Sequence, residues 1–308
     1  MGGDGDGWVH CAQGHRHWGR FGAAGLLIAE EQQAVLQHRA PWTHEGGTWG
    51  LPGGARDSHE DVVATALREA HEEAEIEAAA VAPLGWWRDD HGGWSYTTVV
   101  AHPRASIHPH AANAESTEIR WWPTGDIDQL PLHRGLAGAW PRLRHPPAPL
   151  VVIVDSANVV GARPDGWWRD RLGATRRLLD QLGVLARAGI PAQSLPRGVS
   201  PGGLDGMLPG IALVVEGAAR PLAQELTQTQ TQTQTDDERW WDAAVTVLAA
   251  PRDGDTSIVD AANESATAGR QTVVVSADRG LRQRLDDGVH VAGPSWLLEQ
   301  VTASDLHA

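Results

Sequence analysis

The sequence predicts an α/β protein built from two domains. Its 308 residues suffice for two domains of about 100 to 200 residues, each with its own core. Short apolar runs of strand length alternate with longer helical stretches, as in sheets that helices cover. Three prolines within 145–149 (HPPAP) indicate a stiff, extended connector. We therefore expect a first domain at residues 1–145, a linker at 146–149 and a second domain at 150–308.

The first half contains four strand-like runs and one strong helical segment. The segment begins at about Ser58, which forms an imperfect capping box with Asp61, and apolar residues then recur at helical spacing. The stretch 18–25 (WGRFGAAG) leads into the first strand. The predicted strands are 23–29, 33–37, 95–101 and 119–123, and the predicted helix is 58–74.

The second half reads as buried strands that alternate with helices, which predicts a parallel sheet covered on both faces. The Thr/Gln tract 227–235 lacks apolar residues that could pack, so we expect a surface loop there. The predicted strands are 150–154, 211–215 and 272–276, and the predicted helices are 167–185 and 240–249.

Composition excludes several classes of protein. The net charge is −14, every basic residue is arginine, and both halves are net negative, which argues against a general nucleic-acid coat. A single cysteine, Cys11, excludes an internal disulfide framework. No apolar run approaches the roughly 18 residues that a membrane span needs. The acidic, glycine-rich start does not resemble a secretory signal, so we expect a cytoplasmic protein with no membrane partner.

Three glutamates of the predicted helix form the most informative pattern. Glu69, Glu72 and Glu73 stand at i, i+3 and i+4, which places like charges within about one turn. A hard divalent cation such as Mg²⁺ neutralises such a cluster, because it prefers oxygen ligands. A solvated acidic helix face is the alternative. The glycine turn ahead of the helix, and Arg68 beside the cluster, favour the metal.

This stretch resembles the signature of Nudix hydrolases. The segment 51–54 (LPGG) is the usual lead-in, and the spacing of glycine, glutamate, Arg-Glu and Glu-Glu is in register. Glu75 stands where the family has a glycine that ends the helix, so the helix exit is the one departure. The matching positions are Gly54, Glu60, Arg68, Glu69, Ala70, Glu72, Glu73 and Ile76.

The resemblance implies an α/β/α sandwich with a mixed sheet that hydrolyses a nucleoside diphosphate linked to another moiety. It implies Mg²⁺ or Mn²⁺ on the three glutamates, support from Glu60, and an arginine, Arg68, that orients a glutamate. In this family the general base is either a box glutamate, here Glu72, or an acid from a later loop. Glu115 and Glu118 are the candidates for that later acid.

Substrate contacts are expected from Gly53 and Gly54, and from Arg39, which could reach a phosphate. One or two of Trp49, Trp86, Trp87, Trp94 and Trp121 could stack on a base, whereas most tryptophans belong to cores or interfaces.

Near the amino terminus, Cys11 follows His10 and precedes His15 and His17. A lone cysteine with scattered histidines is a poor match to the four paired ligands of structural zinc, so we do not expect zinc there.

Acidic residues near predicted strand ends are the main clue in the second half. Asp155, Glu216 and Asp278 follow three of the strands, and Asp255 stands near a helix start. The carboxyl ends of parallel strands border the ligand crevice, so these acids could converge, although strand-end aspartates also cap helices.

The segments 154–159 (VDSANV) and 275–280 (VSADRG) resemble the NYN branch of the PIN-like nucleases. That resemblance implies Mg²⁺ binding and cleavage of RNA. Two features weaken the match: Thr256 stands where a second acid would strengthen the site, and the second half has a negative net charge. A PIN-like domain kept for packing or binding is therefore an equal alternative.

Three functions therefore remain open: a Nudix pyrophosphohydrolase, a metal-dependent ribonuclease whose first half only binds a nucleotide, and a non-catalytic nucleotide sensor. Four Trp-Trp pairs would suit contacts between domains or subunits, so an oligomer is possible, but they could equally pack within each domain.

Overall fold

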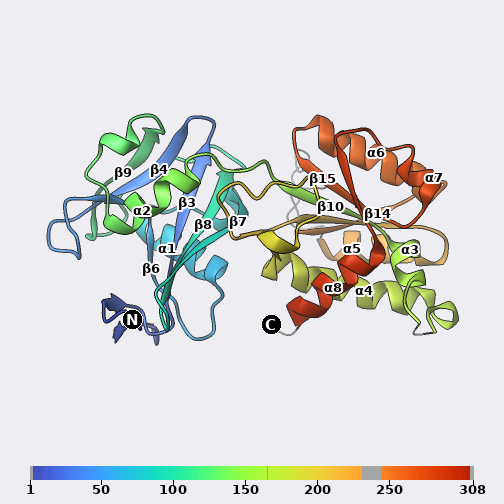
Figure 1. Ribbon diagram of the computed structural model, residues 1–308, viewed down its shortest axis with the longest axis horizontal. Coiled ribbons are helices and arrows are strands. Elements are labelled where there is room, and N and C mark those ends of the chain that lie inside the picture. The colour runs from blue at the N-terminus through green and yellow to red at the C-terminus, as the bar shows by residue number, and fades with distance from the viewer. Residues whose placement is uncertain (1–2, 165, 231–243, 306–308) are drawn as a thin grey trace. The chain divides into compact units, whose positions relative to one another are not determined.

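The computed structural model describes residues 3–164, 166–230 and 244–305 (Figure 1). The chain divides into two compact units, Met1–Pro147 with Gly202–Gly206, and Ala148–Pro201 with Met207–Ala308. The segment Gly202–Gly206 thus belongs to the first unit, although it lies in the second half of the sequence.

A mixed sheet forms the centre of the first unit, as expected. Strand β3 runs parallel to β8 and antiparallel to β4 and β6, and the path β7-β8-β3-β4-β5 is extended by β9 on β4. A separate hairpin, β1-β2, precedes the sheet. The strands are β1 (Trp8–His10), β2 (Arg16–Trp18), β3 (Ala23–Glu30), β4 (Gln33–Arg39), β5 (Trp49–Gly50), β6 (Gly53–Ala55), β7 (Val81–Asp90), β8 (Ser95–Pro103) and β9 (Ser116–Pro123).

Alternation along β3 sends side chains to two cores, one on each face of this sheet. Leu26 and Ile28 pack with Ala66 and Ala70 of α1 on one face. On the other face, Leu27 packs in a cluster that includes four residues of α2. The result is the predicted α/β/α sandwich. The helical elements of this unit are α1 (Val62–Ala74), η1 (Ala78–Ala80), η2 (Ile127–Gln129) and α2 (Arg134–Leu143).

Helix α1 begins one turn later than the sequence predicts. Asp61, not Ser58, is its N-cap, and Asp61 Oδ1 accepts a hydrogen bond from the backbone N–H of Ala64 at 2.8 Å. Ser58 instead donates its backbone N–H and its hydroxyl to Asp4. The predicted capping box was therefore wrong, because a partner distant in sequence takes the Ser58 side chain.

Strand β7 was missed because its sequence, VAPLGWWRDD, interrupts the apolar alternation with proline and glycine. The structure accommodates both residues at a bulge between Pro83 and Gly85, where the pairing with β8 shifts register.

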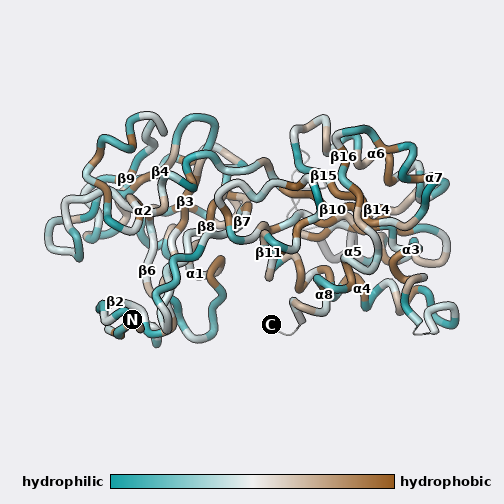
Figure 2. The backbone as a smooth tube through the Cα atoms, viewed as in Figure 1, coloured by the Kyte–Doolittle hydropathy of each residue, from teal (hydrophilic) through white to brown (hydrophobic). Residues whose placement is uncertain are grey.

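A five-stranded parallel sheet forms the second unit, which confirms the predicted parallel sheet. Its order is β14-β13-β10-β15-β16, and every neighbouring pair is parallel. Val152 and Val154 of β10 pack in the core with α4 and α8, whereas Val151 and Ile153 pack with α6 on the opposite face. Figure 2 shows the apolar residues concentrated along these strands.

The strands from residue 150 onward are β10 (Leu150–Asp155), β11 (Ile190–Pro191), β12 (Gly206–Met207), β13 (Gly210–Val215), β14 (Val245–Ala249), β15 (Gln271–Val275) and β16 (Val289–Ala292). The helices of the second unit are α3 (Ser156–Gly161), α4 (Arg171–Ala188), α5 (Pro221–Gln230), α6 (Gly254–Thr267), α7 (Arg279–Arg282) and α8 (Pro294–Asp305), with short turns η3 (Trp167–Arg169), η4 (Ala192–Ser194) and η5 (Gly217–Ala219).

Two sequence predictions for the second half are wrong. The predicted helix 240–249 is the strand β14 from Val245 onward, because the β-branched run Val-Thr-Val pairs in parallel with β13, and 240–243 lie outside the described residues. The predicted Thr/Gln loop is helical up to Gln230, where it continues α5, and 231–235 likewise lie outside the described residues.

Within the ranges that the structure describes, no helix is both long enough and apolar enough to cross a bilayer.

Candidate active site

Two glycines allow helix α1 to approach strand β6 closely. The backbone N–H of Gly53 donates to Glu73 Oε2 at 2.8 Å. A Cβ on Gly54 would lie 2.5 Å from Glu69 Oε1, and one on Gly53 would lie 2.6 Å from the carbonyl oxygen of Ala24. A larger residue at Gly54 would therefore displace the Glu69 carboxylate, and one at Gly53 would clash with the backbone of β3.

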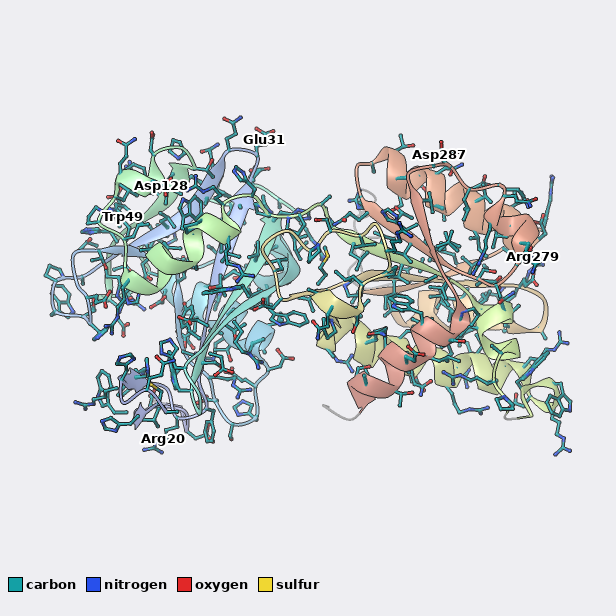
Figure 3. The ribbon with its side chains drawn as sticks, in the orientation of Figure 1. Arg20, Glu31, Trp49, Asp128, Arg279 and Asp287 are labelled. Carbon is teal, nitrogen blue, oxygen red and sulfur yellow. The ribbon has the colours of Figure 1, made fainter. Side chains whose placement is uncertain are left out.

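Arg68 holds the carboxylates of the helix in place (Figure 3 shows the side chains over the fold). Its Nε and Nη2 donate to the two carboxylate oxygens of Glu60 at 2.8 and 3.0 Å. Its Nη1 donates to Glu69 at 2.7 Å and to Glu72 at 3.4 Å, and Nη2 also donates to the carbonyl oxygen of Ala55. The hydrogen bonds from Arg68 lower the pKa of Glu60 to about 2, so Glu60 is the ionised partner of this guanidinium.

Glu73 is a buried carboxyl, and Glu69 is a largely buried one whose charge Arg68 partly compensates. Burial is the main cause that raises the pKa of Glu69 to about 7 and that of Glu73 to about 8, and the charge of Glu69 contributes to the rise at Glu73. Glu73 is 3% exposed, whereas the Glu72 side chain is 56% exposed. An all-oxygen set of converging carboxylates, which resists ionisation while it is empty, fits a hard divalent cation well.

The structure separates the two later acids. Glu115 lies close enough to Glu69 and Glu73 for its charge to raise both of their pKa values. Glu118 lies on β9, half exposed, with an oxygen 3.2 Å from Nε of Arg120. Only Glu115 of this pair is therefore brought to the glutamate cluster.

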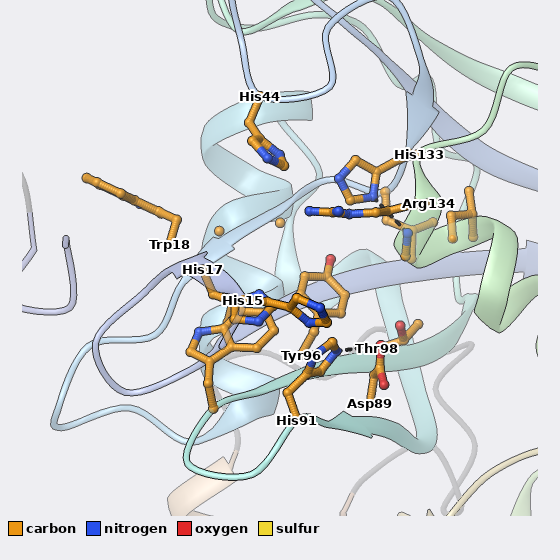
Figure 4. A pocket seen from close by; sticks show the side chains of 18 of the residues that line it. His15, His17, Trp18, His44, Asp89, His91, Tyr96, Thr98, His133 and Arg134 are labelled. Carbon is orange, nitrogen blue, oxygen red and sulfur yellow. Dashed lines mark hydrogen bonds and ion pairs between the residues drawn. The ribbon is translucent and has the colours of Figure 1, made fainter. Parts of the chain in front are cut away.

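A pocket of about 520 Å³ adjoins Gly53 and Gly54 (Figure 4). Arg39 lines it, as expected, and so do two of the five candidate tryptophans, Trp87 and Trp94. Trp49 belongs instead to the core, where it is 7% exposed.

Several lining residues were not predicted to line a substrate pocket. They are Trp8, His15, His17, Trp18, His44, His91, Tyr96, His133 and Arg134. They come from loops and strand ends that local spacing does not connect. Tyr96, the sole tyrosine, was the one compositional signal available.

His133 and Arg134 form one side of the pocket, at the start of α2. The backbone N–H of Gly135 donates to Nδ1 of His133, which is the N-cap. The Glu45 carboxylate accepts a hydrogen bond from the backbone N–H of Arg134 at 2.9 Å and forms an ion pair with Nε of Arg134 at 2.7 Å. Burial lowers the pKa of His133, so its imidazole favours the neutral form.

The helix exit keeps the shape that a glycine would give. Glu75 adopts a left-handed conformation, φ 51° and ψ 35°. Its N–H donates to the carbonyl of His71, and that of Ile76 donates to the carbonyl of Ala70. The bond from the left-handed Glu75 to the carbonyl of His71, four residues earlier, is that of an αL C-cap motif. The departure from the signature therefore leaves the positions of the glutamates intact.

Comparisons with known proteins identify the family. The model of the NUDIX domain matches residues 19–143. A Mycobacterium tuberculosis protein named "Putative 8-oxo-dGTP diphosphatase 3" is 48% identical over 157 residues, which cover 47% of this chain and 72% of that protein. The chain belongs to the Nudix family. It is an enzyme of the Nudix pyrophosphohydrolase type, and Nudix hydrolases use divalent metal ions.

Two further Nudix relatives match the same half. A Bifidobacterium longum "Nucleoside triphosphate pyrophosphatase/Nudix hydrolase fusion protein" is 45% identical over 147 residues, covering 45% of this chain and 30% of that protein. The crystal structure of a Nudix hydrolase from M. smegmatis, RenU, is 45% identical, covers 46% of this chain and 93% of its own, and has a TM-score of 0.43.

In the second unit, the four predicted acids lie near the carboxyl edge of the parallel sheet. Asp155 accepts hydrogen bonds from the N–H of Asn158 and the hydroxyl of Ser276, at 3.0 and 2.9 Å. Burial raises the pKa of Asp155, and the charges of Asp255 and Glu216 raise it further. Burial raises the pKa of Asp255 as well, and the charge of Asp278 adds to that rise.

These acids also perform local structural tasks. Asp155 and Asp278 are the N-caps of α3 and α7, and Glu216 accepts the N–H of Gly254 at 2.9 Å. The capping alternative raised by the sequence thus applies to Asp155 and Asp278.

Proposed function

We propose that the first unit hydrolyses a nucleoside diphosphate linked to another moiety, with Mg²⁺ as the cation. The observation that carries this proposal is the packing of Glu69 and Glu73 against the Gly53–Gly54 backbone, which also lines the pocket. Carboxylate oxygens and substrate phosphates are the ligands with which proteins usually hold Mg²⁺.

Each residue then has a distinct task. Glu69, Glu72 and Glu73 would hold the cation, which supplies neutralising charge for the diphosphate. Arg68, fixed by both oxygens of Glu60, keeps Glu69 and Glu72 oriented.

A water molecule must lose a proton as it attacks phosphorus. Glu72, the most exposed box glutamate, is the first candidate for that base, and Glu115 is the second because its charge reaches the cluster.

The pocket supports a nucleoside triphosphate as substrate. Trp87, Trp94 and Tyr96 offer aromatic surfaces for a base, while Arg39 and Arg134 offer charge for phosphates. The name of the M. tuberculosis relative adds oxidised purine deoxynucleotides as the first compounds to assay.

The test is turnover of a substrate panel by the full chain with Mg²⁺. The panel contains 8-oxo-dGTP, unmodified triphosphates, dinucleoside polyphosphates and nucleotide sugars. We expect Glu72→Gln and Glu73→Gln to lower the rate by about 10²-fold or more, as for loss of a metal ligand or base. Glu77→Gln, on an exposed residue just beyond α1, should retain the parental rate.

Turnover that survives both changes contradicts the assignment. Nucleotide binding without turnover at any Mg²⁺ concentration would favour the sensor instead.

We also propose, as a second candidate function, metal-dependent RNA cleavage by the second unit. Asp155 of β10 and Asp278 after β15 border the boundary between these strands, where the strand order reverses. In open parallel sheets, ligands bind at such switch points. A shared site for Mg²⁺ is supported by the charges of these acids, which affect one another's pKa values. The acids are Asp155, Glu216, Asp255 and Asp278.

The full chain carrying Glu73→Gln, which silences the first unit, provides the cleanest test. We expect it to cleave single-stranded or structured RNA with Mg²⁺, and we expect an added Asp155→Asn to abolish cleavage. Asp180→Asn, on an exposed residue of α4, is the matched control. Cleavage that is unaffected by Asp155→Asn rules out this site.

A further inference from the structure

Four metal-binding side chains of the first unit meet beside the pocket. One ligand atom from each of Cys11, His15, His17 and His91 lies within 4.8 Å of the others. Cys11, His15 and His17 come from the β1-β2 hairpin, and His91 comes from the turn between β7 and β8. The glutamate cluster supplies none of these atoms.

Backbone hydrogen bonds bring the two segments together. Within the hairpin, the N–H of Cys11 donates to the carbonyl of His15 at 3.0 Å. Between the segments, the N–H of Ala12 donates to the carbonyl of Gly92 at 2.7 Å. The His17 ring stacks on Trp94 of the β7-β8 turn, with centroids 3.9 Å apart and planes at 10°. The ligands are therefore preorganised by the fold.

Two buried histidine nitrogen atoms indicate that this cluster is a binding site. Among the described residues, His91 Nδ1 and His17 Nε2 are buried and have no hydrogen-bond partner. A buried polar atom left unpaired costs about 1 to 3 kcal/mol, so such atoms are uncommon without a functional reason. Two of them in one cluster of four metal-binding side chains indicate that the cluster is completed by an ion.

Asp89 orients one of these rings. Its Oδ2 lies 3.1 Å from Nε2 of His91, which leaves Nδ1 of the same ring as the unpaired nitrogen (Figure 4). Metal-binding histidines commonly use the second ring nitrogen to bind a carboxylate in this way.

We propose that Cys11, His15, His17 and His91 bind a zinc ion. One thiolate and three imidazoles form a soft, nitrogen-rich set that suits Zn²⁺ and not Mg²⁺. Tetrahedral zinc with bonds of about 2.0 to 2.3 Å separates its ligands by roughly 3.3 to 3.8 Å. The ligand atoms, all within 4.8 Å of one another, already approach those separations.

The proposed ion has a structural role. Four protein ligands leave no open position for substrate or water, which is typical of structural zinc. His15, His17 and His91 also line the pocket, so the ion would tie the β1-β2 hairpin to the β7-β8 turn and stiffen that wall.

Cobalt substitution of the full chain tests the proposal directly. Because Cys11 is the sole cysteine, a thiolate-to-cobalt charge-transfer band reports this site alone. We expect about one zinc per purified chain, and after its removal one Co²⁺ with that band and the intense visible absorption of tetrahedral cobalt. Zinc should displace the cobalt, and Mg²⁺ should not.

Variants separate the ligands from their neighbours. Cys11→Ser should abolish the charge-transfer band, and His91→Ala should weaken metal binding at least 100-fold. Asp89→Asn, which removes only the orienting carboxylate, should weaken it about 10- to 100-fold. His10→Ala, on the exposed neighbour of Cys11, should change nothing. Glu73→Gln should keep the band as well, which separates this site from the glutamate cluster.

Some outcomes would overturn the proposal. They are a wild-type chain that binds cobalt without the thiolate band, and a His91→Ala chain that keeps the band and the affinity of the wild type. Circular dichroism of each metal-free variant checks that it is folded. If a variant does not fold, the cobalt titration of the wild type still tests the proposal.

Discussion

Replacing Glu73 by glutamine should make the metal-free first unit more stable at alkaline pH. The Glu73 carboxyl is 3% exposed, and its burial raises the pKa from 4.5 to about 8. Between these two pH values the unfolded chain has released the proton and the folded chain still holds it. Stability therefore falls as the pH rises through this window, and the loss is complete above pH 8.

The size of the effect follows from the same shift. One pKa unit corresponds to about 1.4 kcal/mol, so the shift amounts to at most about 5 kcal/mol, and relaxation of the protein around the buried charge brings the expected value to about 2 to 5 kcal/mol. Glutamine removes the ionisation and keeps an oxygen that can accept the N–H of Gly53. Its amide can also donate to Gln37, which lies within hydrogen-bonding reach and whose Oε1 is, among the described residues, buried without a partner.

Urea unfolding in a chelator, followed by tryptophan fluorescence, measures this effect. The two units can unfold separately, so the transition that Glu73→Gln shifts is assigned to the first unit. We expect the difference in unfolding free energy between variant and wild type to grow by about 2 kcal/mol or more from pH 6 to pH 9. Glu77→Gln should follow the wild type at every pH.

Parallel pH profiles for Glu73→Gln and wild type would refute this reasoning, because they would mean that Glu73 ionises normally in the folded chain. Saturating Mg²⁺ provides an independent check. It should restore the stability of the wild type at pH 9 and stabilise Glu73→Gln much less, since the variant has lost a carboxylate ligand.

Three further predictions follow from the same geometry. Arg68→Lys should lower turnover about 10-fold or more at unchanged secondary structure, because lysine cannot hold both oxygens of Glu60; rates and circular dichroism measure this. Glu75→Gly should raise the urea stability of the first unit by about 0.5 to 1 kcal/mol, because it relieves a left-handed residue and loses only an exposed pair with His110; no gain would mean that the conformation is unstrained. Metal-free Asp155→Asn should unfold at a higher urea concentration than the wild type, and this difference should be larger at pH 8 than at pH 5. The reason is that the pKa of Asp155 is raised in the folded chain, so the wild type loses stability as the pH rises. An equal difference at both pH values would show that ionisation of Asp155 does not affect stability.

The glutamate cluster could be predicted because it is local. Helical spacing alone places Glu69, Glu72 and Glu73 within one turn, and the signature supplies the glycines that receive them. The sheets could be predicted for a similar reason, since buried strands such as β10 and β13 are continuous apolar runs bounded by polar residues.

Elements whose conformation depends on distant partners were harder to predict. The short segment of β14 is a strand because it pairs with β13, although the window 240–249 reads as helical. Helix α1 begins at Val62 because Asp4 takes the polar groups of Ser58. In both places a contact between segments far apart in the chain decides the outcome, and propensity within a short window contains no information on it.

The cysteine-histidine cluster shows how such contacts limit a spacing rule. Along the hairpin, a lone cysteine with the scattered histidines His10, His15 and His17 lacks the paired spacing of structural zinc, so the sequence argues against a site there. His91, the fourth ligand of the proposed site, follows β7, the strand that proline and glycine conceal in the sequence. Because β7 was not predicted, the sequence offered no reason to place His91 next to the β1-β2 hairpin. A spacing rule tests whether one segment holds a complete ligand set, so a site that two segments share becomes visible only when the fold pairs them.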